Sequence, residues 1–169
     1  MKFSRSSTTL LAAAIFLSAT SLITTSLAVQ AADTMDRAIF VNADELRWDN
    51  APPSLPGGAK MTVLLGDPSK PGPFVLRFKT DGEYKIPPHF HSRAEALTVI
   101  SGTLYLGGGE KFDPTVAHAL SAGGFHYLPA KVPHFAFSKA PTVVEIHGEG
   151  PFDIVYLNPD DDPQKARSR

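Results

Sequence analysis

The chain has 169 residues, no cysteine and a formal net charge of −1, with 16 basic and 17 acidic residues. Disulfides and cysteine nucleophiles are therefore excluded, and this charge balance offers no basic patch that would favour nucleic acid as a partner. The length suits one domain with a buried core.

Residues 1–31 have the pattern of a secretory signal peptide. Lys2 and Arg5 precede a nonpolar, hydroxyl-rich stretch from Leu10 to Leu27, and Val29-Gln30-Ala31 has the small residues of a cleavage site. We expect cleavage there, a periplasmic or secreted location, and no membrane attachment afterwards. The alternative is an uncleaved anchor helix, which the many serines and threonines and the lack of a basic stop-transfer cluster disfavour.

Residues 32–73 are predicted to form an N-terminal arm of strands and a loop. Prolines and glycines crowd the stretch from Pro52 to Gly58. Proline removes backbone donors and glycine loosens the backbone, so regular structure is not expected there. We interpret this stretch as an ordered loop across the mouth of a barrel. Residues 60–65 are rich in β-formers and predict a strand.

Residues 74–157 are predicted to form the main β-domain, and residues 158–169 a charged, flexible C-terminal tail. Leu97–Ile100 is nonpolar and β-branched, Ser101-Gly102 interrupts it, and Thr103–Leu106 resumes the pattern. This pattern predicts two strands joined by a tight turn. The domain is therefore expected to be β-rich.

His89, His91 and Glu95 have spacing that suits metal chelation if their segment is extended. Side chains alternate along a strand, so residues two apart leave the same face, and Glu95 keeps that parity. On a helix the two imidazoles would diverge by about 200°. His134 offers a third imidazole. Three imidazoles and a carboxylate suit Fe, Mn, Zn, Ni or Cu, and they leave positions open on a metal that prefers five or six ligands.

The spacing of these residues resembles the two motifs of the cupins. The first motif has a glycine, HxH, a glutamate and a second glycine, and the matching residues are Gly82, His89, His91, Glu95 and Gly102. The match departs by one extra residue between Gly82 and His89. The joint spacing is far more specific than a single HxH.

The second motif is matched by Gly123, Pro129 and His134. Lys131 stands where the motif has a glycine, and Ser138 stands in place of its asparagine. All four ligand positions are kept, and the resemblance covers about residues 75–156.

The resemblance implies an all-β fold, either a small antiparallel β-barrel or a double-stranded jelly roll, with the metal inside. It implies that His89, His91, Glu95 and His134 bind one divalent transition metal. Similar cupins include dioxygenases, decarboxylases and isomerases, which predicts a small-molecule enzyme. The alternative is a non-catalytic cupin that binds a metal or small ligand, and an interaction protein with a vestigial site is disfavoured. A homodimer through edge strands is compatible with either function.

Three further residues compete for a role in the site. His147 shares a strand face with Glu145, and if that face points inward, His147 could carry a proton during catalysis; the alternative is a structural histidine. Arg77 is either a contact for a substrate carboxylate or a solvated strand residue. His126, outside the ligand spacing, is interpreted as structural.

Overall fold

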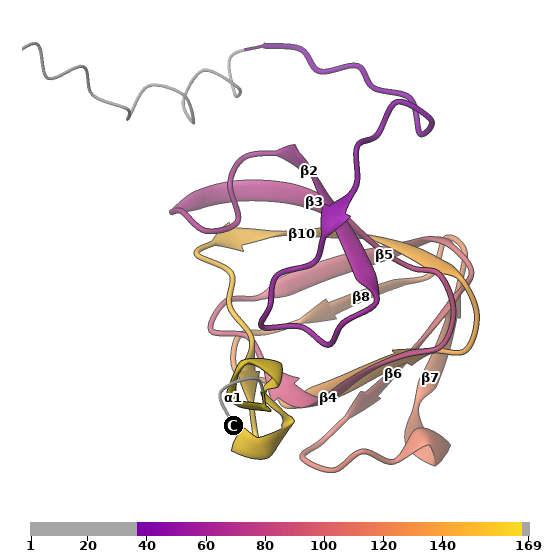
Figure 1. Cartoon of the computed structure of the whole chain (residues 1–169), viewed down its shortest axis with the longest axis vertical. Coiled ribbons are helices and arrows are strands. Elements are labelled where there is room, and N and C mark those ends of the chain that lie inside the picture. Colours follow the sequence, from indigo (N-terminus) through magenta and orange to yellow (C-terminus); the bar gives the residue numbers. More distant parts are fainter. Residues whose placement is uncertain (1–36, 167–169) are drawn as a thin grey trace, which may run out of the picture.

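The computed structural model describes residues 37–166, so the expected signal segment lies outside the described residues. Two antiparallel sheets hold nearly all of the regular structure (Figure 1). The first sheet has the order β1 (Asp49–Asn50), β2 (Ala59–Leu65), β3 (Gly72–Thr80), β10 (Thr142–Gly150), β5 (Glu95–Ser101) and β8 (Phe125–Leu128). The second has the order β11 (Val155–Tyr156), β4 (Tyr84–Phe90), β9 (His134–Ser138), β6 (Thr103–Gly108) and β7 (His118–Ser121).

The two sheets bury nonpolar side chains between them. In β10, Val144 lies opposite Phe78 of β3 and Val99 of β5, and Val144 and Val99 are 4% and 1% exposed. The second sheet contributes Phe135 and Ala136, which are also buried. The prediction of an all-β fold is confirmed. Within residues 37–166 the sheets do not close into one barrel, so the jelly roll is the form that applies.

The predicted tight turn forms between β5 and β6, and the two strands that it joins belong to different sheets. Gly102 has a φ of 78°, and a Cβ there would lie 2.4 Å from the carbonyl oxygen of Pro141, so glycine suits this tight turn. Both strands form as predicted, yet β5 pairs with β10 and β8, whereas β6 pairs with β7 and β9. The turn therefore carries the chain from one sheet to the other.

The predicted proline-rich loop lies against the space between the sheets, where its Leu55 lines a pocket. The hydroxyl of Tyr84 donates to the carbonyl oxygen of Pro56 at 2.7 Å, and that of Tyr156 donates to the carbonyl oxygen of Ser54 at 2.8 Å. Burial raises the pKa of both tyrosines, so their hydroxyl groups stay protonated and keep donating. Two side chains of the second sheet thus hold the loop by its backbone.

Short helical segments complete the described chain. They are the 3₁₀ helices η2 (Pro114–Val116) and η3 (Pro159–Asp161) and the helix α1 (Pro163–Ala166). The last two lie in the predicted tail, whose flexibility stays a prediction. In residues 37–166, no helix has the length and nonpolar character needed to span a bilayer.

Candidate metal centre

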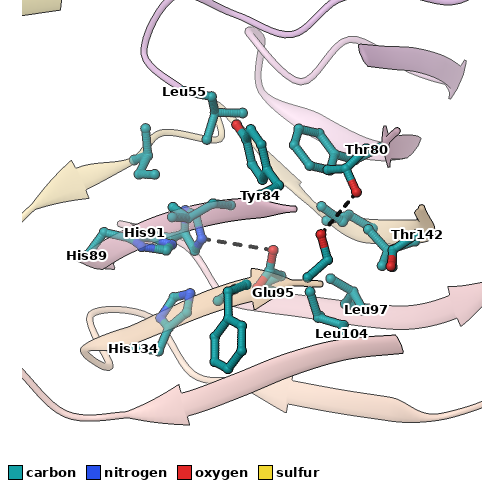
Figure 2. A pocket seen from close by; sticks show the side chains of 18 of the residues that line it. Leu55, Thr80, Tyr84, His89, His91, Glu95, Leu97, Leu104, His134 and Thr142 are labelled. Atoms are coloured by element: carbon teal, nitrogen blue, oxygen red, sulfur yellow. Dashed lines mark hydrogen bonds and ion pairs between the residues drawn. The ribbon is translucent and has the colours of Figure 1, made fainter. Parts of the chain in front are cut away.

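Three buried histidines converge at one point between the sheets. His89 lies near the end of β4, His91 just beyond that strand, and His134 begins β9 opposite His89. Each offers a ring nitrogen, and these three atoms all lie within 4.8 Å of one another. The residues are only 2%, 8% and 2% exposed. Figure 2 shows the three imidazoles gathered at one end of the pocket.

Backbone carbonyl groups fix the orientation of all three rings. Each histidine Nδ1 lies within hydrogen-bond distance of a carbonyl oxygen, which can only accept, so Nδ1 carries the proton and Nε2 keeps its lone pair. The acceptors are Pro87 for His89 at 2.7 Å, Val132 for His134 at 3.0 Å, and Asp153 for His91. The three Nε2 atoms are therefore available as metal ligands.

Burial keeps His89 and His134 neutral. Desolvation, reinforced by the neighbouring histidines, lowers the pKa of His89 to about 3. Desolvation also lowers the pKa of His134. At neutral pH a metal ion would therefore displace no proton from either ring.

Glu95 reaches the same centre from the opposite sheet. Its Oε1 atom lies 3.9 Å from Nε2 of His91, and the residue is 5% exposed. Glu95 does not belong to the strand of His89: β4 ends at Phe90, the chain turns, and Glu95 is the first residue of β5. The argument that all three residues share one strand face is therefore wrong, although Glu95 does lie beside the histidines. Its role as a fourth ligand stays a prediction.

His126, which the sequence predicts to be structural, contacts Glu95 beside the three imidazoles. Its Nε2 atom lies 3.1 Å from Oε2 of Glu95, its side chain is 8% exposed, and its Nδ1 atom is buried without a hydrogen-bond partner. Burial opposes ionisation of Glu95, but the hydrogen bond from His126 and the neighbouring histidines outweigh it and lower the pKa of Glu95 to about 2. The carboxylate is therefore ionised at neutral pH.

A small cavity of about 100 Å³ opens in front of the imidazoles. Much of its wall is nonpolar, including Phe78, Ile86, Leu97, Leu104 and Phe137. The hydroxyls of Thr80 and Thr142 lie at the end away from the histidines (Figure 2). The hydroxyl of Ser138, which also lines the cavity, lies 3.1 Å from that of Thr80. A metal at the histidines would thus face a pocket that suits hydrocarbon.

No protein-family model matches the sequence, and no curated protein sequence matches it. Solved structures do match: the polyketide cyclase RemF from Streptomyces resistomycificus has a TM-score of 0.60 and 15% identity, covering 79% of this chain and 94% of that one. A candidate acetylacetone dioxygenase from Methylibium petroleiphilum PM1 has a TM-score of 0.57 and 19% identity, covering 75% and 85%. An RmlC-like cupin from Shewanella frigidimarina NCIMB 400 has a TM-score of 0.52 and 16% identity, covering 68% and 94%. The chain has the cupin fold.

The fold accommodates both departures from the second cupin motif. Lys131 has a φ of 64°, the left-handed region in which the motif's glycine is unstrained, and its backbone N–H donates to the carbonyl oxygen of His91 at 2.8 Å. Ser138 donates to the carbonyl oxygen of Gly82 at 3.1 Å and lies 3.1 Å from the hydroxyl of Thr80. Serine therefore links the two motif regions in the position of the asparagine.

His147 and Arg77 lie away from this cavity. The His147 side chain is 49% exposed, and its Nε2 atom lies 3.1 Å from Oε1 of Glu145. The other oxygen of Glu145 accepts from Nε of Arg77 at 2.8 Å. Neither residue lines the cavity beside the three histidines. A proton-carrying role for His147 stays a prediction, and the function proposed below does not use it.

Proposed function

We propose that this cupin is a metal-dependent enzyme that acts on a small organic molecule bound between its sheets. The observation that carries the proposal is the set of three clustered imidazoles, each with its Nδ1 atom at a backbone carbonyl oxygen, beside a mostly nonpolar cavity. A purely structural metal site is closed by protein ligands, whereas a catalytic site leaves positions for substrate. Convergent polar groups in a nonpolar pocket are the usual form of a small-molecule site.

The residues present fit a divalent transition metal. His89, His91 and His134 would hold it through Nε2, and Glu95 would add a carboxylate oxygen. Nitrogen and oxygen donors of this kind suit Fe, Mn, Zn, Ni or Cu. A bound metal would supply Lewis-acid chemistry toward an oxygen-bearing substrate, and iron or manganese would also allow dioxygen chemistry.

The chain's own residues would orient the substrate and exclude water. The nonpolar wall would hold the hydrocarbon part, and the loop that carries Leu55 would cover the pocket. Among dioxygenase, decarboxylase and isomerase activities, the likeness to a candidate acetylacetone dioxygenase makes dioxygenase-like chemistry the first to test. The proposed enzyme also acts outside the cytoplasm, which the signal-like pattern of residues 1–31 supports.

Elemental analysis tests the metal site directly. We expect the purified chain to contain about one equivalent of transition metal and His91→Ala to lose most of it. Losing even a residue that only hydrogen-bonds a metal ligand typically lowers metal affinity tenfold or more, and His91 is a proposed direct ligand. His118→Ala is the matched control, since His118 is exposed on β7. Equal metal content in wild type and His91→Ala would contradict the proposal.

Oxygen uptake tests the activity. The iron-loaded protein is presented with β-diketones, phenols and keto acids, and uptake that depends on both iron and substrate supports a dioxygenase. Product analysis with the other metals covers decarboxylation and isomerisation. A protein that binds metal and ligands but turns over none of them is the non-catalytic binding cupin instead.

A further inference from the structure

A second cavity of about 300 Å³ adjoins the one in front of the histidines. Its wall includes Pro52, Met61, Pro68 and Leu76, which line the outer cavity alone. The two cavities share six lining residues: Leu55, Phe78, His91, Ile146, Phe152 and Ile154. The space for a ligand therefore extends from the imidazoles outward beneath the proline-rich loop.

Phe152 and Leu55 stand at the junction of the two cavities. The Phe152 ring stacks on the His91 imidazole with a centroid distance of 4.4 Å and an interplanar angle of 21°. The backbone N–H of Phe152 donates to the carbonyl oxygen of Pro68 at 2.8 Å, which ties this segment to the turn after β2. A ligand that reaches the imidazoles would therefore lie against an aromatic ring and the Leu55 side chain.

Neither cavity has a lysine or arginine among its described lining residues. Their carboxylates are Glu95 inside and Asp153 at the outer cavity, and both oxygens of Asp153 accept from Ser92, at 2.7 Å from its N–H and 2.6 Å from its hydroxyl. The Arg77 guanidinium faces outward, paired with Glu145. The described lining of the two cavities therefore offers no lysine or arginine to pair with an anionic ligand.

The inner hydroxyls are also engaged. The hydroxyl oxygens of Thr80 and Ser138 lie 3.1 Å apart, and the Ser138 hydroxyl donates to the carbonyl oxygen of Gly82. The Thr142 hydroxyl donates to the carbonyl oxygen of Ala140 at 3.0 Å. A carboxylate or phosphate buried here would lose its hydration without gaining a partner, which is costly. A divalent cation bound beside the Glu95 carboxylate would give the centre a net charge of +1, which one anionic group of a ligand would neutralise.

We propose that the joined cavities bind a neutral or singly ionised oxygen chelator that carries a nonpolar chain or ring, and that they reject dicarboxylates and phosphate esters. The oxygen end lies at the imidazoles, and the nonpolar end lies past Phe152 in the outer cavity. This inference rests on the proposed function, because it names the substrate class of the same site.

Binding to the zinc-loaded protein, measured by calorimetry, tests the charge preference without turnover. Pentane-2,4-dione and malonate form a matched pair, because both can chelate through two oxygens joined by a three-carbon unit, whereas the dione is neutral or singly ionised and malonate is doubly ionised. We expect malonate to bind at least about tenfold more weakly. Each methylene added to one end of the dione should strengthen binding about threefold to fourfold until the outer cavity is filled.

Two variants locate the nonpolar end. Met61→Trp narrows the outer cavity alone, so it should reduce the gain from longer chains much more than it changes the affinity for pentane-2,4-dione, which is too short to reach that cavity. Leu55→Arg places a cation at the junction on a loop, so it should narrow or reverse the preference against malonate. Leu55→Gln is its uncharged control and should not favour malonate.

The outcomes separate this inference from the proposed function. Metal content is measured in every sample, and a protein without metal overturns both. A metal-loaded protein that binds malonate as tightly as pentane-2,4-dione, or whose affinity does not rise with chain length, overturns the substrate class alone.

Discussion

Nε2 of His126 lies 3.1 Å from one carboxylate oxygen of Glu95, while the other oxygen lies 3.9 Å from Nε2 of His91. His126 thus holds Glu95 from β8, with one oxygen turned toward the three imidazoles. Nδ1 of His126 is buried without a partner, and a proton there would be an unsatisfied donor. The tautomer with hydrogen on Nε2 is therefore favoured, and it donates to Glu95.

Replacing His126 should weaken metal binding although His126 is not a ligand. We expect His126→Phe to lower metal affinity by about tenfold to 100-fold, because outer hydrogen bonds orient ligating groups. His126→Gln, which can still donate, should lose less. Competition with a chelator measures the affinity, and circular dichroism checks the fold. An unchanged affinity in a folded His126→Phe protein would contradict this role.

Substitutions at Lys131 test whether its left-handed backbone, close to the proposed ligands, affects stability. A β-branched residue tolerates a φ of 64° poorly, so Lys131→Val should lower the free energy of unfolding by about 1–2 kcal/mol. Lys131→Gly should change it by less than about 1 kcal/mol, since relief of strain offsets the entropy of glycine in the unfolded chain. Urea unfolding measures both. Lys111→Val, exposed and without a positive φ, is the control, and an equal loss there would rule out a backbone cause.

The metal-free protein should lose stability as the pH falls. The pKa of His89 is about 3 in the folded state and 6.5 in the unfolded chain, so below pH 6.5 the unfolded chain takes up a proton that the folded state does not. The stability that the folded state gains by keeping His89 neutral is present in full above pH 6.5 and is lost as the pH falls toward 3. The free energy of unfolding should fall by about 2 kcal/mol between pH 6.5 and 5.

His89→Gln removes the titrating group and should flatten the dependence in that range, whereas His118→Gln should keep it. Thermal unfolding in the presence of a chelator, measured at several pH values, gives the comparison. If His89→Gln lost stability with falling pH as steeply as the wild type does, the acid sensitivity would come from other groups.

Export predicts a specific N-terminus. If residues 1–31 are a cleaved signal, the protein recovered from the periplasm or medium should begin at Ala32. Mass spectrometry of the intact protein measures this. Recovery of the full chain in the membrane fraction would support the uncleaved anchor instead.

The three histidines could be predicted because their positions depend on short spacings and one strand pairing. His89 and His91 lie two apart at the end of β4, and His134 pairs opposite His89. Glu95 was predicted for the wrong reason, since the turn before β5 carries the chain to the other sheet. Such a turn has the same local composition as a hairpin, and only distant pairings distinguish them.

Two orientations were readable from alternation. In β10, Val144 and Ile146 are nonpolar while Glu145 and His147 are polar, which indicates that His147 faces outward. In β8 the register places His126 on the opposite face from Phe125 and Tyr127, which are 59% and 60% exposed. The inward position of His126 could not be predicted from the sequence, because nonpolar residues usually mark the buried face of a strand and here the aromatic residues lie on the exposed face.

The loop that covers the cavities is anchored through the carbonyl oxygens of Ser54 and Pro56, which every amino acid possesses. Leu55 between them can therefore be exchanged without breaking either tyrosine contact. Related chains could diverge in the molecules they accept by changing this single side chain while inheriting the same closure, which makes the position a natural starting point for evolving or engineering new selectivity.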